Sequence, residues 1–94
     1  MLYTVSYDFS GSDDERNALE AALMAAGPAI RCLESTWLLI SELTAAQVRK
    51  SLEEAVSSRL TSLITEIAGK NNAWSLDRNR GVKEWRDQNN VQMS

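Results

Sequence analysis

Asp8 is the residue of this 94-residue chain whose type and position best suit chemistry. It lies near the end of a predicted strand, just before a turn formed by Ser10, Gly11 and Ser12. A carboxylate there can bind Mg²⁺, and in a twofold dimer it can meet its own copy. Asp is also common as a turn-capping residue near strand ends. Taken alone, Asp8 fits turn capping more often than metal binding, and the sequence leaves both roles open.

The composition excludes several other kinds of site. The chain has no histidine and a single cysteine, Cys32. Acid–base catalysis by histidine, Ser-His and Cys-His pairs and cysteine-rich zinc sites are therefore excluded. Any metal site would hold a hard cation such as Mg²⁺ through oxygen ligands. Cys32 follows an apolar-leaning run, which predicts a buried small hydrophobic side chain rather than a reactive thiol.

Basic residues stand beside aromatic ones in the last quarter of the chain. Such a mixture can bind single-stranded nucleic acid, although interleaved acids dilute the positive field. The alternatives are a solvated tail, or an arm that packs on a neighbouring subunit through Trp74 and Trp85. The four candidate nucleic-acid-binding residues are Arg78, Arg80, Lys83 and Arg86.

The net charge is −3, with an isoelectric point near 4.9. It divides into −4 for residues 1–27, −1 for residues 28–69 and +2 for residues 70–94. A basic footprint over the whole domain, typical of nucleic-acid binding, is therefore absent. The chain has no apolar run of transmembrane length and does not begin like a signal peptide, so we expect a cytoplasmic protein with no membrane contact.

A short series of strands and helices must position these residues. Ser12 with Glu15, and Thr44 with Gln47, match the capping box that begins a helix. Elsewhere, apolar residues at every second position predict strands, and apolar residues at helical spacing predict helices. These patterns place Leu23, Trp37 and Val56 in the core and make Leu60 a candidate extension of the second helix. The predicted elements are a strand at 2–9, a helix at 12–26, strands at 29–34 and 36–41 (or one long bulged strand in their place), a helix from 44 to 56, and a strand at 63–68.

The order β-α-β-β-α-β predicts an α+β fold, a ferredoxin-like βαββαβ two-layer sandwich. We expect one antiparallel sheet with both helices on one face, because two helices with one apolar stripe each cannot enclose both faces. The second face, with Leu2, Thr4, Ser6 and Asp8, then stays open, and a twofold dimer through it is the economical expectation. The predicted domain spans 1–76, including a short extra strand at 73–76, and a polar C-terminal tail spans 77–94.

Three short strings support a resemblance to a known family. They are Tyr7-Asp8 near the end of the first strand, Ser35-Thr36-Trp37 at the hairpin, and Leu43 to Gln47 at the second helix. With the element order, they make residues 1–76 similar to the CRISPR-associated Cas-two superfamily, most closely to its stand-alone SinR-like relatives. The resemblance implies a ferredoxin-like homodimer in which Asp8, paired across the dimer, is a magnesium ligand. It places Ser35 at a position that is often small and polar.

Two classes of function follow, of which the first, implied by the resemblance, is the leading hypothesis and the second is the alternative. The first is a homodimeric, magnesium-dependent nuclease acting on RNA or DNA, with Asp8 as its catalytic residue. The second is a non-catalytic dimeric interaction module that binds another protein through its acidic surface: an adaptor, a regulator or a phage-encoded inhibitor. Basic residues lining the dimer groove would favour the nuclease, and a groove lined by acids would favour the module.

Overall fold

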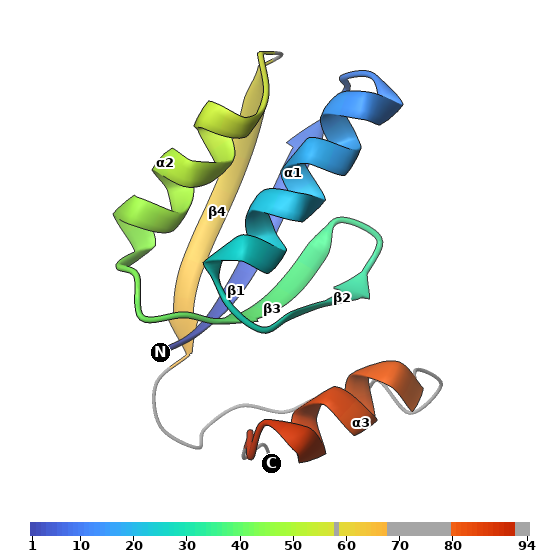
Figure 1. The fold of residues 1–94 in the computed structure, drawn as a ribbon, viewed down its shortest axis with the longest axis vertical. Coiled ribbons are helices and arrows are strands. Elements are labelled where there is room, and N and C mark those ends of the chain that lie inside the picture. Colours follow the sequence, from blue (N-terminus) through green and yellow to red (C-terminus); the bar gives the residue numbers. More distant parts are fainter. Residues whose placement is uncertain (58, 68–79, 92–94) are drawn as a thin grey trace.

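The computed structural model describes residues 1–57, 59–67 and 80–91. The four strands form one antiparallel sheet in the order β2-β3-β1-β4, and α1 and α2 lie together on one face (Figure 1). This is the predicted α+β ferredoxin-like sandwich, followed by one further helix. No helix in the described part of the chain is long and apolar enough to cross a membrane. The elements are β1 (Leu2–Phe9), α1 (Asp13–Ala26), β2 (Ala29–Leu33), β3 (Thr36–Ile40), α2 (Ala45–Ala55), β4 (Leu60–Ile67) and α3 (Arg80–Gln88).

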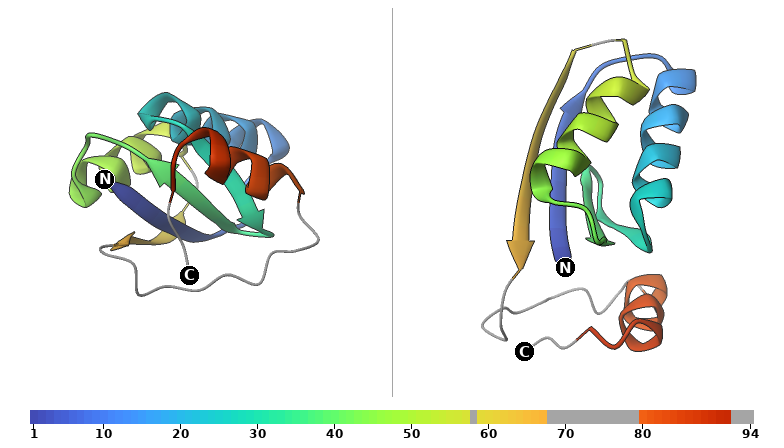
Figure 2. Two further views of the ribbon diagram at one scale, coloured as in Figure 1. Left: turned by 90° about the horizontal axis from the view of Figure 1, so that it is seen from below. Right: turned by 60° about the vertical axis from the view of Figure 1, so that its left-hand side comes forward.

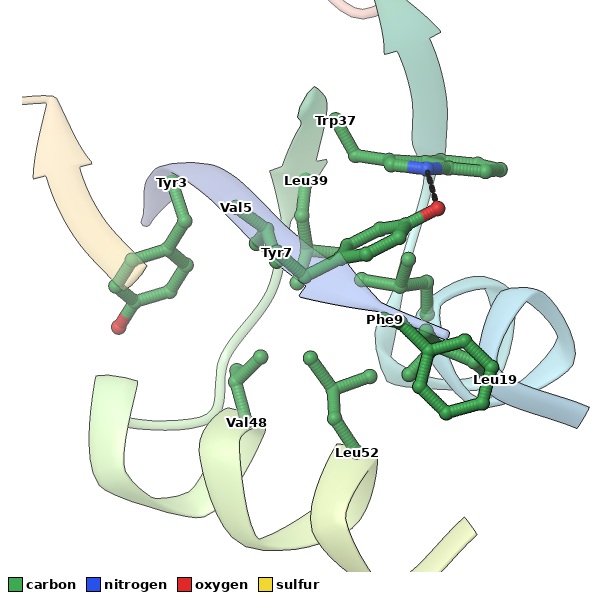
Figure 3. Close-up of a cluster of buried hydrophobic side chains, with 10 residues drawn as sticks. Tyr3, Val5, Tyr7, Phe9, Leu19, Trp37, Leu39, Val48 and Leu52 are labelled. Carbon is green, nitrogen blue, oxygen red and sulfur yellow. Dashed lines mark hydrogen bonds between the residues drawn. The ribbon is translucent and has the colours of Figure 1, made fainter. Parts of the chain in front are cut away.

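The alternation of β1 puts its aromatic side chains against the two helices. They pack with Leu52 of α2 and Trp37 of β3 (Figure 3). They also pack with Leu23 of α1, which like Trp37 was predicted to lie in the core. The Trp37 indole N–H donates to the Tyr7 hydroxyl at 3.4 Å. Each fully buried large apolar side chain stabilises the fold by about 1.5–3 kcal/mol. The buried members of this first core are Tyr3, Val5, Tyr7, Phe9, Leu19, Leu23, Trp37, Leu39, Val48 and Leu52, and Val56 packs against them while partly exposed.

The helices begin where the capping residues predict. Thr44 and Gln47 form the reciprocal capping box of α2, with bonds of 3.2 and 2.8 Å. The Ser12 hydroxyl accepts from the Glu15 N–H at 3.2 Å and so caps α1. The Glu15 carboxylate also accepts two hydrogen bonds of 3.0 Å from Ser57, which ties the start of α1 to the segment after α2.

The last strand begins earlier than predicted. Helix α2 ends at Ala55, and Val56 already has extended dihedral angles of −130° and 150°. Leu60 then pairs with Phe9 as the first residue of β4, so it belongs to the strand and not to α2. Apolar spacing alone allowed either assignment, and pairing with β1 decides between them.

Residues 80–88 form a helix where the sequence predicted only a polar tail. Val82 and Trp85, three residues apart on α3, are 0% and 9% exposed. They pack on Leu38 and on apolar side chains of the second sheet face, which include Leu2 and Ile30. The second face is therefore partly covered by the chain itself, and Trp85 packs against residues of the same chain. Trp74 and the strand predicted at 73–76 lie outside the described residues.

The docking of α3 leads to a stability prediction. Val82→Ala should lower the free energy of unfolding by about 1.5 kcal/mol, because it removes two buried methyl groups from the contact with the sheet. Lys83→Ala, at the exposed neighbouring position, should change it by less than about 0.5 kcal/mol. Urea unfolding of both variants measures the difference. Equal effects would contradict the packing of α3 on the sheet.

Candidate functional site

Asp8 lies where the alternation of β1 predicts. It is exposed, between two buried neighbours, and its side chain projects from the second face of the sheet. Its partner on β4 is Thr61. On the same face the Ser6 and Thr36 hydroxyls share a hydrogen bond of 3.0 Å. This end of the second face therefore offers one carboxylate among hydroxyl groups.

Ser35 is brought to the same end of the sheet as Asp8. It lies in the turn that joins β2 to β3, and its carbonyl accepts a hydrogen bond from the Tyr7 N–H at 3.0 Å. The hairpin turn is thereby fixed beside the end of β1. The observed role of Ser35 is to anchor this turn through its main chain.

The oxygen atoms around Asp8 are of the kind that Mg²⁺ prefers, but they carry one negative charge. No group of three or more His, Cys, Asp or Glu side chains that could hold a metal ion occurs among the residues the structure describes. Mg²⁺ keeps several waters and is usually held by one or two carboxylates. Asp8 supplies one such carboxylate, and the Ser6 hydroxyl on the same face already shares a hydrogen bond with Thr36.

The basic residues do not join Asp8 within one subunit. Helix α3, which carries Lys83 and Arg86, packs near the start of β1, and Asp8 lies at the other end of that strand (Figure 1). The Arg86 guanidinium stands 3.5 Å from the Asp87 carboxylate. Arg80 begins α3, and Arg78 lies outside the described residues.

Acidic residues dominate the surface instead. Asp13 and Asp14 are exposed in the first turn of α1, a few residues after Asp8. Residues 1–57 and 59–67 carry ten acids and five bases. Three of these bases are already within 4 Å of acids on the same chain, which reduces the positive charge that they present to a binding partner. These pairs are Arg31–Glu20, Arg49–Glu53 and Lys50–Glu54.

Cys32 is only partly buried, and it packs beside the core formed by α3 and the second face. Its thiol donates to the Thr36 carbonyl oxygen at 3.4 Å. Burial raises the pKa of the Cys32 thiol above its ordinary value. At neutral pH the group therefore stays protonated, and a protonated thiol is a poor nucleophile. A structural role, as the sequence predicted, agrees with this environment.

Two surface features were missed by the sequence argument. One is the docked helix α3, whose signal was the spacing of Val82 and Trp85. The other is the outer edge of β4, whose signal was a β-branched run with one charged residue, Glu66.

The chain matches no protein-family model, no curated protein and no solved structure in the three comparisons made.

Proposed function

We propose that this chain is a non-catalytic interaction module of Cas-two-like architecture, working in the cytoplasm, that binds a basic surface of another protein. The observation that carries the proposal is the excess of ten acids over five bases in residues 1–57 and 59–67, with Asp13 and Asp14 close to the end of β1. Such a surface repels a phosphate backbone and attracts a cationic protein surface. Adaptors, regulators and phage-encoded inhibitors all belong to this class.

The second candidate is a magnesium-dependent nuclease, favoured by the exposed Asp8 among the hydroxyls of the second face. A bound Mg²⁺ would stabilise charge on the phosphate and lower the pKa of a bound water. Asp8 would hold the cation, and a second copy of Asp8, brought by a dimer through the second face, would complete the carboxylate pair. The open part of that face is the part α3 leaves uncovered.

One experiment separates the two candidates. Single-stranded RNA and duplex DNA are incubated with the full chain in Mg²⁺, in Mn²⁺ and without metal, and binding is followed by gel shift at low salt. We expect neither cleavage nor a shift. Cleavage that needs the metal, is lost in Asp8→Asn and is kept in the matched variant Asp13→Asn would replace the module with the nuclease.

The positive arm of the same experiment titrates the chain with a lysine-rich peptide. The module predicts binding that weakens as salt rises from about 50 to about 200 mM, because salt screens exposed charges. Asp13→Asn combined with Asp14→Asn should weaken it further, while Asp87→Asn on α3 should not. Equal binding by all three proteins would contradict the acidic surface as the binding surface.

A further inference from the structure

Strand β4 forms an outer edge of the sheet. It spans eight residues and pairs with β1 along its whole length. The sheet order leaves no described strand on its other side, as the right-hand view of Figure 2 shows. A long strand edge of this kind offers a row of backbone N–H and C=O groups to another strand.

The hydrogen bonds of β1 show which groups of β4 point outward. The Tyr7 N–H bonds Ser35, and Met1 exchanges both backbone bonds with Ser41, so the odd-numbered residues of β1 face β3. Because successive residues of a strand alternate, its even-numbered residues face β4. Their β4 partners are Ile67, Thr65, Leu63 and Thr61. The outward-directed backbone groups of β4 therefore belong to Leu60, Ser62, Ile64 and Glu66.

The two edges of the sheet differ in protection. The edge strand β2 has five residues, a register shift between Arg31 and Leu33, and α3 packed beside it. Short length, irregular pairing and a cover are the usual ways in which proteins block an edge. Strand β4 has an unbroken register with β1, no proline and a single charge, Glu66. Of the two edge strands, only β4 can therefore accept an added strand.

We propose that β4 pairs antiparallel with β4 of a second copy of this chain, about a twofold axis at Leu63. In this register Leu60 lies opposite Glu66 of the second copy, and Ser62 lies opposite Ile64. All four outward residues are then paired, with about eight backbone hydrogen bonds between the copies. Thr61 faces Thr65 of the second copy, a favourable cross-strand pair.

Side chains select this register over its neighbours. Leu63 is 67% exposed and would meet Leu63 of the second copy, which removes apolar surface from water. A register centred on Glu66 would set two carboxylates opposite each other, which is unfavourable. Registers centred on Ser62 or Ile64 leave an outward residue without a partner in the described strand. Of these registers, only the one about Leu63 pairs all four outward residues within the strand and keeps the two Glu66 carboxylates apart.

This assembly goes beyond the proposed function and rests on different observations. It makes one continuous sheet twice as wide as that of the subunit. The two Asp8 residues would stand about 20 Å apart, from strand spacing and rise along the ladder. They could not share a metal ion, so the edge dimer agrees with the module and not with a paired-Asp8 nuclease.

The test combines mass with site-directed cross-linking. Light scattering at about 100 µM should give twice the 10.5 kDa subunit mass. In a Cys32→Ser background, Leu63→Cys should form a disulfide-linked dimer, since opposite residues there have Cα atoms about 4.5 Å apart. Thr61→Cys should not form one, because Thr61 lies opposite Thr65 of the second copy, several residues along the strand from that copy's Thr61. A monomer at that concentration, or a dimer in which Leu63→Cys does not cross-link or Thr61→Cys does, overturns the proposal.

A backbone variant tests the edge itself. Ser62→Pro removes an outward N–H and leaves the bonds to β1 intact, and proline is tolerated on an edge strand with that orientation. It should raise the dimer dissociation constant about tenfold or more, with an unchanged circular dichroism spectrum. A folded Ser62→Pro variant that dimerises like the wild type would contradict edge pairing. If this variant does not fold, the cysteine pair decides.

Discussion

Leu23→Ala is expected to lower the free energy of unfolding by about 2–5 kcal/mol. Leu23 is fully buried between α1 and the sheet, so the truncation removes apolar contacts and leaves a cavity. Its chain neighbour Met24 is 60% exposed on the same helix. Met24→Ala should change the stability by less than about 0.5 kcal/mol. Both variants place alanine in α1, so the comparison isolates burial from helix propensity.

Urea unfolding followed by circular dichroism measures both variants. The expected result is a clear fall in the midpoint for Leu23→Ala and almost none for Met24→Ala, with the same dependence on urea. Similar midpoints for the two would mean that α1 presents a different face to the sheet.

Gly27→Ala is expected to cost at least about 3 kcal/mol. Gly27 ends α1 with φ 154° and ψ −177°, a backbone conformation that is essentially restricted to glycine. A Cβ atom at this position would collide with the carbonyl oxygen of Ile40. This backbone cannot easily withdraw, because the Ile40 N–H bonds the Pro28 carbonyl at 2.8 Å. The variant would therefore disturb the junction of α1, β2 and β3.

Gly81→Ala is the matched control for the added methyl group. Gly81 is exposed within α3, where alanine is the better helix former by up to about 1 kcal/mol. Thermal unfolding should thus show a large fall in midpoint for Gly27→Ala and no fall for Gly81→Ala. A Gly27→Ala protein as stable as the wild type would contradict the observed end of α1.

The parts of the fold that depend on local pattern could be predicted from the sequence. The period-two alternation of β1 determines which of its side chains are buried. The side chains of Ser12 and Thr44 determine where α1 and α2 begin. The start of β4 could not be placed in the same way, because Leu60 continues the apolar spacing of α2 as well as that of a strand. Only pairing with Phe9, far away in the sequence, distinguishes the two.

Helix α3 was missed for a related reason. Two apolar residues, Val82 and Trp85, give a weak local signal in a charged segment, and their burial depends on the second face of a sheet assembled elsewhere. The same limit applies to the candidate site. Alternation predicted the exposure of Asp8, but the separation of Asp8 from Lys83 and Arg86 depends on where α3 docks. The open edge of β4 depends on strand order, which no single segment encodes.

The central position of β1 also has a consequence for how the chain folds. Leu2 pairs with Ile40 on one side and with Ile67 on the other, so both strands that pair with β1 come from later parts of the chain. Closing such long loops costs entropy before any contact repays it, which slows folding. During synthesis one edge of β1 stays unpaired until β4 has left the ribosome, because domains fold as their segments emerge. The nascent chain therefore carries its first strand for the longest time without a complete sheet.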